Sequence, residues 1–233
     1  MVKAELIKRS PLRILEAAIH GGPGRGAIAV LASPKGVGKT ACLVHIATDK
    51  LLQGKPVIHV SYASRVDYII TWYEDIFKQI AKDRRLTSAL DVHDEIIKNR
   101  VIMNFKQDGT RTDQVLRSVE AMITFGKFAA DTIIVDGYDF SRPSCDDLAA
   151  FKGFAGRLGV EVWFSASLKE TGEPLYDESG IPTALRPVCG AIDVLITLQA
   201  SGDGVELRVV KDREHPAPGL LPLKLDPKTL LIK

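Results

Sequence analysis

One stretch of the chain combines glycines, a lysine and a hydroxyl side chain at a spacing suited to holding phosphate. It begins at Ser33, ends at Thr40 and reads SPKGVGKT. An apolar run, Ala27–Leu31, precedes it, and a helix-like segment, Ala41–Leu52, follows it. A strand, a glycine-rich turn and a helix in this order are the context of a P-loop, whose backbone N–H groups cradle phosphate oxygens.

The match to the usual pattern, G-x-x-x-x-G-K-[ST], has one departure. Ser33 stands where the first glycine is expected, and it is tolerable there if its φ is negative. We expect Lys39 to reach the outer phosphates and Thr40 to bind Mg²⁺. The alternative is a glycine-rich turn that only happens to precede Lys-Thr. The expected nucleotide-binding residues are Ser33, Pro34, Lys35, Gly36, Val37, Gly38, Lys39, Thr40 and Cys42.

A carboxylate ends a second apolar run, Thr132–Asp136. Ligands of open α/β sheets bind outside the carboxyl ends of the strands, so Asp136 is the expected partner of Mg²⁺ beside Thr40. The alternative is that Asp136 only starts the turn that ends at Asp139. We assign Asp139 to this turn, although it could also lie in the outer shell of Mg²⁺.

Length and composition fit one α/β domain spanning residues 1–233. Hydrophobic residues make up 45% of the chain, and the formal net charge of +2 does not indicate a nucleic-acid-binding protein. The sequence has no apolar N-terminal segment and no run long enough to cross a membrane. Three scattered cysteines, Cys42, Cys145 and Cys189, indicate reduced thiols in a cytoplasmic protein.

Apolar periodicity predicts strands alternating with helices over the first two thirds of the chain. The predicted helices are 11–20, 41–52, 64–85, 87–98, a segment around 115–126 and one capped by Ser144; the predicted strands are 27–31, one beginning at 56–59, 101–105, 132–136 and 160–166. Residues 169–183 have no periodicity and are expected to form a loop. Short strands at 192–198, 205–210, 221–225 and 230–232 complete a mostly parallel sheet extended by antiparallel strands.

Together these motifs resemble the RecA-type P-loop ATPases, in particular the KaiC-like branch, over most of the chain. The resemblance implies a three-layer fold, ATP and Mg²⁺ as cofactors, and Lys39 and Asp136 as catalytic residues. Residues 162–166 resemble the strand that carries a polar γ-phosphate sensor, here Ser165 or Ser167. The strand ending in Lys211-Asp212-Arg213 resembles the family's Lys-x-Arg segment, which implies that Lys211 and Arg213 act in a neighbouring subunit's site.

One family feature is missing. The family places a catalytic glutamate after the second strand, but Val60–Arg65 contains no carboxylate. Without a positioned base, hydrolysis loses about 10²–10⁴-fold; Asp67, Glu74 or Asp139 would have to replace it. The leading hypothesis is an ATP-binding regulatory protein with slow or partner-stimulated ATPase activity. The alternatives are a nucleotide-sensing interaction module without hydrolysis and a recombinase-like DNA-dependent ATPase.

The sequence favours a protein partner over nucleic acid. The loop after the fifth predicted strand carries Glu170, Glu173, Asp177 and Glu178 against Lys169, which would repel phosphate. Basic residues at 82, 84, 85, 98 and 100 are interpreted as solvated surface. The expected partners are therefore ATP or ADP and either further copies of the chain in a ring or another protein.

Overall fold

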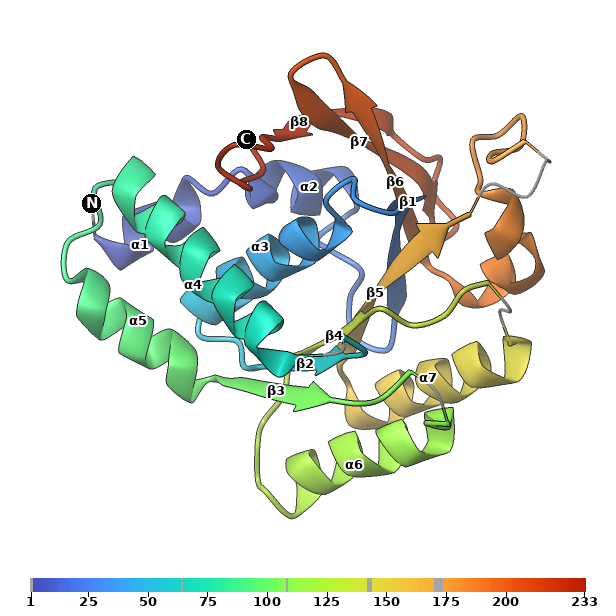
Figure 1. Cartoon of the computed structure of the whole chain (residues 1–233), viewed down its shortest axis with the longest axis horizontal. Coiled ribbons are helices and arrows are strands. Elements are labelled where there is room, and N and C mark those ends of the chain that lie inside the picture. The colour runs from blue at the N-terminus through green and yellow to red at the C-terminus, as the bar shows by residue number, and fades with distance from the viewer. Residues whose placement is uncertain (1, 64, 108, 142–143, 170–173) are drawn as a thin grey trace.

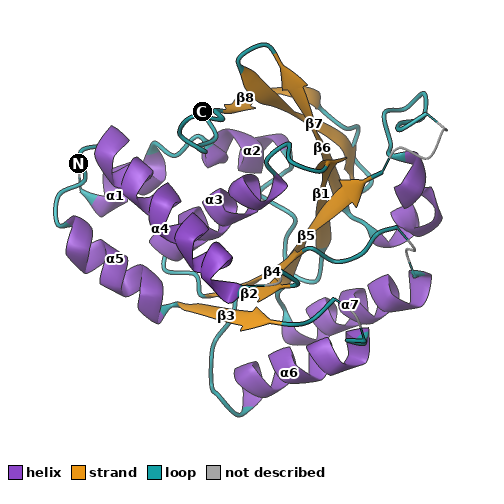
Figure 2. Cartoon of the chain, in the orientation of Figure 1, coloured by secondary structure: helices purple, strands orange, loops and turns teal. Residues whose placement is uncertain are grey.

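The computed structural model describes residues 2–63, 65–107, 109–141, 144–169 and 174–233. One mixed sheet crosses the molecule, and helices cover both of its faces (Figures 1 and 2). The described helices are α1 (Lys3–Lys8), α2 (Leu12–Ala18), α3 (Lys39–Leu52), α4 (Val66–Asp83), α5 (Ala89–Lys98), α6 (Thr112–Thr124), α7 (Cys145–Leu158) and the 3₁₀ helix η1 (Thr183–Ala191).

The sheet has the strand order β3-β2-β4-β5-β1-β6-β7-β8. Its strands are β1 (Ile28–Pro34), β2 (Val57–Ser61), β3 (Arg100–Asn104), β4 (Thr132–Asp136), β5 (Glu161–Leu168), β6 (Val194–Ser201), β7 (Gly204–Asp212) and β8 (Gly219–Leu225). The six strands in the order β3-β2-β4-β5-β1-β6 pair in parallel, whereas β7 and β8 pair antiparallel at one edge of the sheet. The predicted α/β class and the mostly parallel sheet with antiparallel C-terminal strands are confirmed.

Two apolar clusters lie on opposite faces of the sheet. One contains side chains of α1–α5, and the other contains those of α6, α7 and η1 (Figure 1). Strands β1, β2 and β4 are almost continuously buried because both of their faces are covered. Helix α3 is buried along nearly its whole length, with Thr40 as its one residue outside the buried set. The helix therefore passes through the middle of one apolar layer, and this packing holds the turn that precedes its first residue, Lys39, in place.

Two helices were not predicted from the sequence, and one predicted strand is not formed. Helix α1 and the 3₁₀ helix η1 were not predicted, because short helices give little periodic signal. The segment 230–232 was predicted as a strand, but it forms only one isolated bridge, between Ile232 and Leu225. Ser144 caps α7 as predicted, since its Oγ accepts a hydrogen bond from the Asp147 N–H at 3.1 Å. The predicted cap at residue 64 lies outside the described residues.

Candidate functional site

The turn between β1 and α3 leaves its backbone donors available. Gly36 and Gly38 have φ values of 85° and 116°, in the left-handed region that suits glycine. Ser33 is not among the residues with positive φ, so serine fits the position where the pattern has glycine. The backbone N–H groups of residues 35–41 donate to no described backbone oxygen; the first to do so is that of Cys42, which donates to the Gly38 carbonyl at 3.0 Å. Unpaired N–H groups at a helix N-terminus are donors of the kind that bind anions.

Gly38 is constrained by packing as well as by its backbone. A Cβ atom at this position would lie 2.3 Å from Leu225 Cδ2 on β8. The same construction at Gly36 meets nothing within 4 Å. The turn is therefore pressed against the antiparallel edge of the sheet at Gly38 and open to solvent at Gly36.

Lys39 lies in the fold of this turn with a buried side chain, 7% exposed. Its Nζ donates to three neutral acceptors, the Ser33 carbonyl at 3.0 Å, the Ser33 Oγ at 3.2 Å and the Pro34 carbonyl at 2.8 Å. Burial lowers the pKa of Lys39 to about 8, against the opposing effect of the Asp136 carboxylate. No carboxylate of the described residues forms an ion pair with Lys39, so its charge is available to an anion.

Asp136 is held between side chains from two other elements. Its Oδ2 accepts a hydrogen bond from Thr40 Oγ1 at 2.9 Å, and its Oδ1 accepts one from Ser165 Oγ at 2.6 Å. Ser165 in turn accepts a hydrogen bond from the Gly137 N–H at 2.8 Å. Because β5 lies between β1 and β4 in the sheet, Thr40 after β1, Ser165 on β5 and Asp136 at the end of β4 lie close enough to form this hydrogen-bonded network.

A hollow of about 670 Å³ opens over these groups. Its charged lining consists of Lys35, Lys39 and Lys169 against Asp136 and Asp139, a surplus of one positive charge. Lining residues that sequence reasoning missed are Ala41, Tyr62, Ala63, Trp72, Gln107, Gly137, Tyr138, Phe140 and Lys169. Tyr62 and Tyr138 directly follow or nearly follow strands β2 and β4, so aromatic residues just beyond strand ends were the available signal.

The three carboxylates that could replace the catalytic glutamate differ in their distance from the hollow, because only Asp139 lines it. Asp139 lines the hollow, and its Oδ1 accepts a hydrogen bond from the Ser141 N–H at 2.9 Å. Asp67 is exposed and pairs with Arg65, and Glu74 pairs with His93 Nε2 at 2.7 Å. Both candidate sensors, Ser165 and Ser167, also line the hollow. Of the carboxylates considered from sequence, Asp139 is thus the one that is placed beside Asp136.

Cys42 does not belong to this site. Its side chain is fully buried in the apolar cluster, and burial raises its pKa to about 12. Its backbone N–H already donates to Gly38. Neither the thiol nor the amide faces the hollow, so the expectation that Cys42 binds nucleotide is corrected.

Lys211 and Arg213 lie at the end of β7, beside the N-terminal ends of the parallel strands, whereas the turn lies at the C-terminal ends of those strands. The Nζ of Lys211 donates to the carbonyls of Cys189 and Ile192, both at 2.6 Å. Arg213 donates to the carbonyls of Ile19, Gly22 and Pro23 at 2.6–3.1 Å. These contacts give both side chains a structural role within the chain, and their action in a neighbouring subunit stays a prediction.

The charged surfaces considered for nucleic acid are partly engaged. In the described part of the loop after β5, Asp177 pairs with Arg186 at 3.1 Å; residues 170 and 173 lie outside the described residues. Arg100 stacks over the Tyr73 ring at 4.4 Å from its centroid. In the described ranges, no helix has the length and apolarity to cross a bilayer, and no cluster of three or more His, Cys, Asp or Glu side chains could hold a metal by itself.

Comparison of the chain with models of known protein families and with curated proteins gave no match.

Proposed function

We propose that this chain binds ATP together with Mg²⁺ in the hollow over residues 33–40 and hydrolyses it slowly or on stimulation by a partner. The observation that carries the proposal is the convergence of Lys39, Thr40 and Asp136 around a turn whose N–H groups are unused. A phosphate cradle, a cation and a hydroxyl–carboxylate pair are the groups that a magnesium nucleotide requires. The hollow of about 670 Å³ is in the range of small-molecule sites.

The same residues suit Mg²⁺ because this ion takes few protein ligands. It is usually held by one or two carboxylates, by waters and by substrate phosphates, so no cage of acidic side chains is needed. Thr40 Oγ1 and Asp136 Oδ2, already 2.9 Å apart, would hold the ion directly or through water. When bound, the ion would neutralise charge on the phosphates. Ser165 fixes the other oxygen of Asp136 and so orients this carboxylate.

We further propose that the chain is a RecA-like protein of the KaiC-like branch. The support is the order β4-β5-β1, which brings the Asp136 carboxylate, the Ser165 hydroxyl and the turn at 33–40 to one sheet edge. In this proposal the absent glutamate is replaced by Asp139, which activates water less well because it also accepts the Ser141 N–H. Slow turnover follows from this arrangement.

Calorimetric titration of ATP with Mg²⁺ tests the binding proposal. We expect saturable binding that Lys39→Ala weakens about 10- to 150-fold, because the loss of a charge-assisted contact to phosphate costs about 1.5–3 kcal/mol. Lys55→Ala, three residues beyond the C-terminal end of the same helix, is the matched control and should bind as the unaltered protein does. Equal affinity of Lys39→Ala and the unaltered protein would refute the assignment.

The second candidate function is a nucleotide-sensing module that binds without hydrolysis, favoured by the absence of a carboxylate in the segment 60–63. Release of phosphate separates the two functions. Turnover above the spontaneous rate that Asp139→Asn lowers about 10-fold or more, with ATP affinity retained, supports the ATPase. Binding without measurable turnover supports the module.

A further inference from the structure

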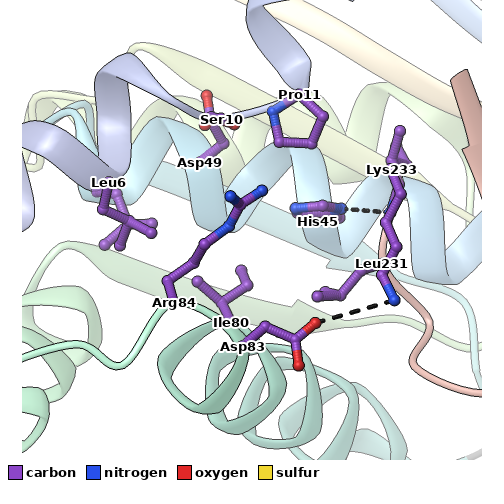
Figure 3. Close-up of a pocket in the computed structure, with 12 residues that line it drawn as sticks. Leu6, Ser10, Pro11, His45, Asp49, Ile80, Asp83, Arg84, Leu231 and Lys233 are labelled. Carbon is purple, nitrogen blue, oxygen red and sulfur yellow. Dashed lines mark hydrogen bonds and ion pairs between the residues drawn. The ribbon is translucent and has the colours of Figure 1, made fainter. Parts of the chain in front are cut away.

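A second cavity lies against the middle and C-terminal part of α3, whereas the candidate nucleotide site lies at the N-terminus of this helix. It has a volume of about 290 Å³ and shares no lining residue with the hollow over residues 33–40. Its walls come from α1, α3, the end of α4 and the C-terminal segment (Figure 3). The volume equals that of about ten water molecules in the liquid.

Most of the wall is apolar. Leu6, Pro11, Leu52, Ile80 and Leu231 line it, and four of these side chains belong to the buried cluster on this face of the sheet. An apolar wall of this kind favours a hydrocarbon or aromatic body over an inorganic ion alone.

Two of the lining side chains offer N–H donors for which the described residues supply no acceptor. Arg84, the residue that ends α4, extends its guanidinium into the group of lining residues on the side of His45 (Figure 3). It forms no side-chain hydrogen bond and no ion pair with any residue that the structure describes. His45 accepts the Ile232 N–H at its Nδ1, at 2.9 Å. Burial lowers the pKa of His45 to about 4, so the neutral ring carries its proton on Nε2, the nitrogen that is free to donate.

The two carboxylates at the cavity each have a cationic partner, which is shared with a further carboxylate: Arg13 also pairs with Glu16, and Lys233 Nζ lies 2.8 Å from Asp226. Asp49 accepts from Arg13, with which it forms an ion pair, and from Gln53 Nε2 at 2.7 Å. Asp83 accepts from Gln79 at 3.0 Å and lies 3.9 Å from Lys233 Nζ. Arg84 is therefore the charged side chain of the lining that has no ion-pair partner among the described residues, and its charge is positive.

We propose that this cavity binds a small amphipathic carboxylate, with the carboxylate on Arg84 and His45 Nε2 and the apolar body against Leu6, Ile80 and Leu231. Arginine binds a carboxylate through two parallel hydrogen bonds, and the imidazole N–H adds a third donor. The site does not depend on the proposed nucleotide site and can be tested with the protein free of nucleotide.

Octanoate, octan-1-ol and octylamine are suitable probes because they share one apolar chain and differ in head-group charge. Binding is followed through the NMR signals of the Ile232 and Leu6 amides, which report on this cavity. We expect saturable shifts with octanoate and at least 10-fold weaker binding of octanol and octylamine. Equal or tighter binding of either of them, or no saturable shift with octanoate, would overturn the proposal.

Variants of Arg84 test whether the carboxylate of the ligand binds at this side chain. Arg84→Gln should lower octanoate affinity about 10-fold, to that of octanol, whereas Lys82→Gln, an exposed lysine in the last turn of α4, should leave it unchanged. Octanoate binding that is unaffected by Arg84→Gln would contradict the assignment. If Arg84→Gln fails to fold, Arg84→Lys retains the charge, and the three-probe comparison on the unaltered protein decides by itself.

Discussion

Helix α3 carries a buried lysine near each end, and the two lysines have opposite surroundings. Lys39, at the first turn, is 7% exposed and contacts neutral carbonyl and hydroxyl oxygens. Lys50, at the last turn, is 6% exposed and forms an ion pair with the buried Glu161 at 2.9 Å. The same residue type thus keeps an unused charge at the edge of the sheet formed by the C-terminal ends of the parallel strands, and it is neutralised at the edge formed by their N-terminal ends.

The difference extends to the two edges as a whole. At the edge of Lys50, Glu161 also accepts hydrogen bonds from Thr132 and Trp163, and Arg213 is satisfied by backbone carbonyls. At the edge of Lys39, the backbone donors of the turn have no described backbone acceptor. Charged groups that are fully paired hold a fold together, whereas buried charges and donors without partners indicate a ligand site.

The largest effect should come from Lys50. We expect Lys50→Met to lower the free energy of unfolding by about 3–5 kcal/mol, because it leaves the buried Glu161 carboxylate without its cation. Lys39→Met should cost about 1 kcal/mol or less, because it removes a desolvated charge and leaves neutral acceptors beside an open hollow. Urea unfolding of both variants measures the contrast. Equal losses would mean that Lys39 is a structural lysine like Lys50.

Arg213 distinguishes a structural role from a role in trans. Arg213→Ala should lower the free energy of unfolding by about 2–3 kcal/mol, because three carbonyls lose their donor and the buried Asp212 carboxylate loses an ion-pair partner. Thermal unfolding measures this loss, with Arg208→Ala in β7, the strand that precedes Arg213, as the control. Mass measurement with and without ATP and Mg²⁺ tests the other role. A ring that forms with nucleotide, and whose ATPase activity depends on Arg213, would add a catalytic role, whereas a strict monomer would remove it.

Gly38 and Gly36 separate steric from conformational constraint within the turn. Gly38→Ala should cost about 1–3 kcal/mol, because the new Cβ combines positive φ with a 2.3 Å contact to Leu225. Gly36→Ala should cost less, since only its positive φ opposes the substitution. Chemical unfolding of both variants, and of Gly38→Ala combined with Leu225→Ala, measures the two contributions. If the double variant recovers nothing, the contact with β8 is not the constraint.

The smallest expected effect is a proton count. With a pKa of about 8, Lys39 is about half protonated at pH 8 in the free protein, and a bound polyphosphate raises this pKa. Binding of magnesium ATP at pH 8 should therefore take up about half a proton, and binding at pH 6.5 should take up almost none. Calorimetry in buffers of different ionisation enthalpy gives the count. Uptake that is equal at the two pH values would contradict the assignment to Lys39.

The linkage to stability has a defined sign. Because the folded pKa of Lys39 lies below its ordinary value of 10.5, the unfolded chain binds more protons between pH 8 and pH 10.5. The cost of holding this buried charge is present in full below pH 8 and declines as the pH rises through that window. Lys39→Met should lack this component of the pH dependence, whereas Lys55→Ala should keep it.

Sequence reasoning located the parts of the site that local pattern determines. The turn at 33–40 and the aspartate at 136 were predicted because a strand-ending motif places them at one sheet edge whatever the rest of the chain does. Tyr62, Trp72 and Gln107 were missed because they come from three separate segments that only the tertiary fold brings together. The burial of Cys42 was missed for the same reason, since a helix position faces the core or the hollow according to its neighbours.

The fold showed the same limit. Long periodic segments such as α4 and α6 were predicted within a few residues, because burial of one helix face is visible in the sequence. The cavity beside α3 could not be predicted, since α1 gives no periodic signal and Arg84 sits at a helix end that was interpreted as ordinary surface.

The most direct test of the central claim is the magnesium dependence of ATP binding in the unaltered protein and in Asp136→Asn. We predict that ATP binds the unaltered protein more tightly with Mg²⁺ than with a chelator present, and that Asp136→Asn abolishes this difference while Lys39 still holds the phosphates. ATP affinity that is the same with and without Mg²⁺, or no binding at all, would contradict a magnesium nucleotide site built from Lys39, Thr40 and Asp136.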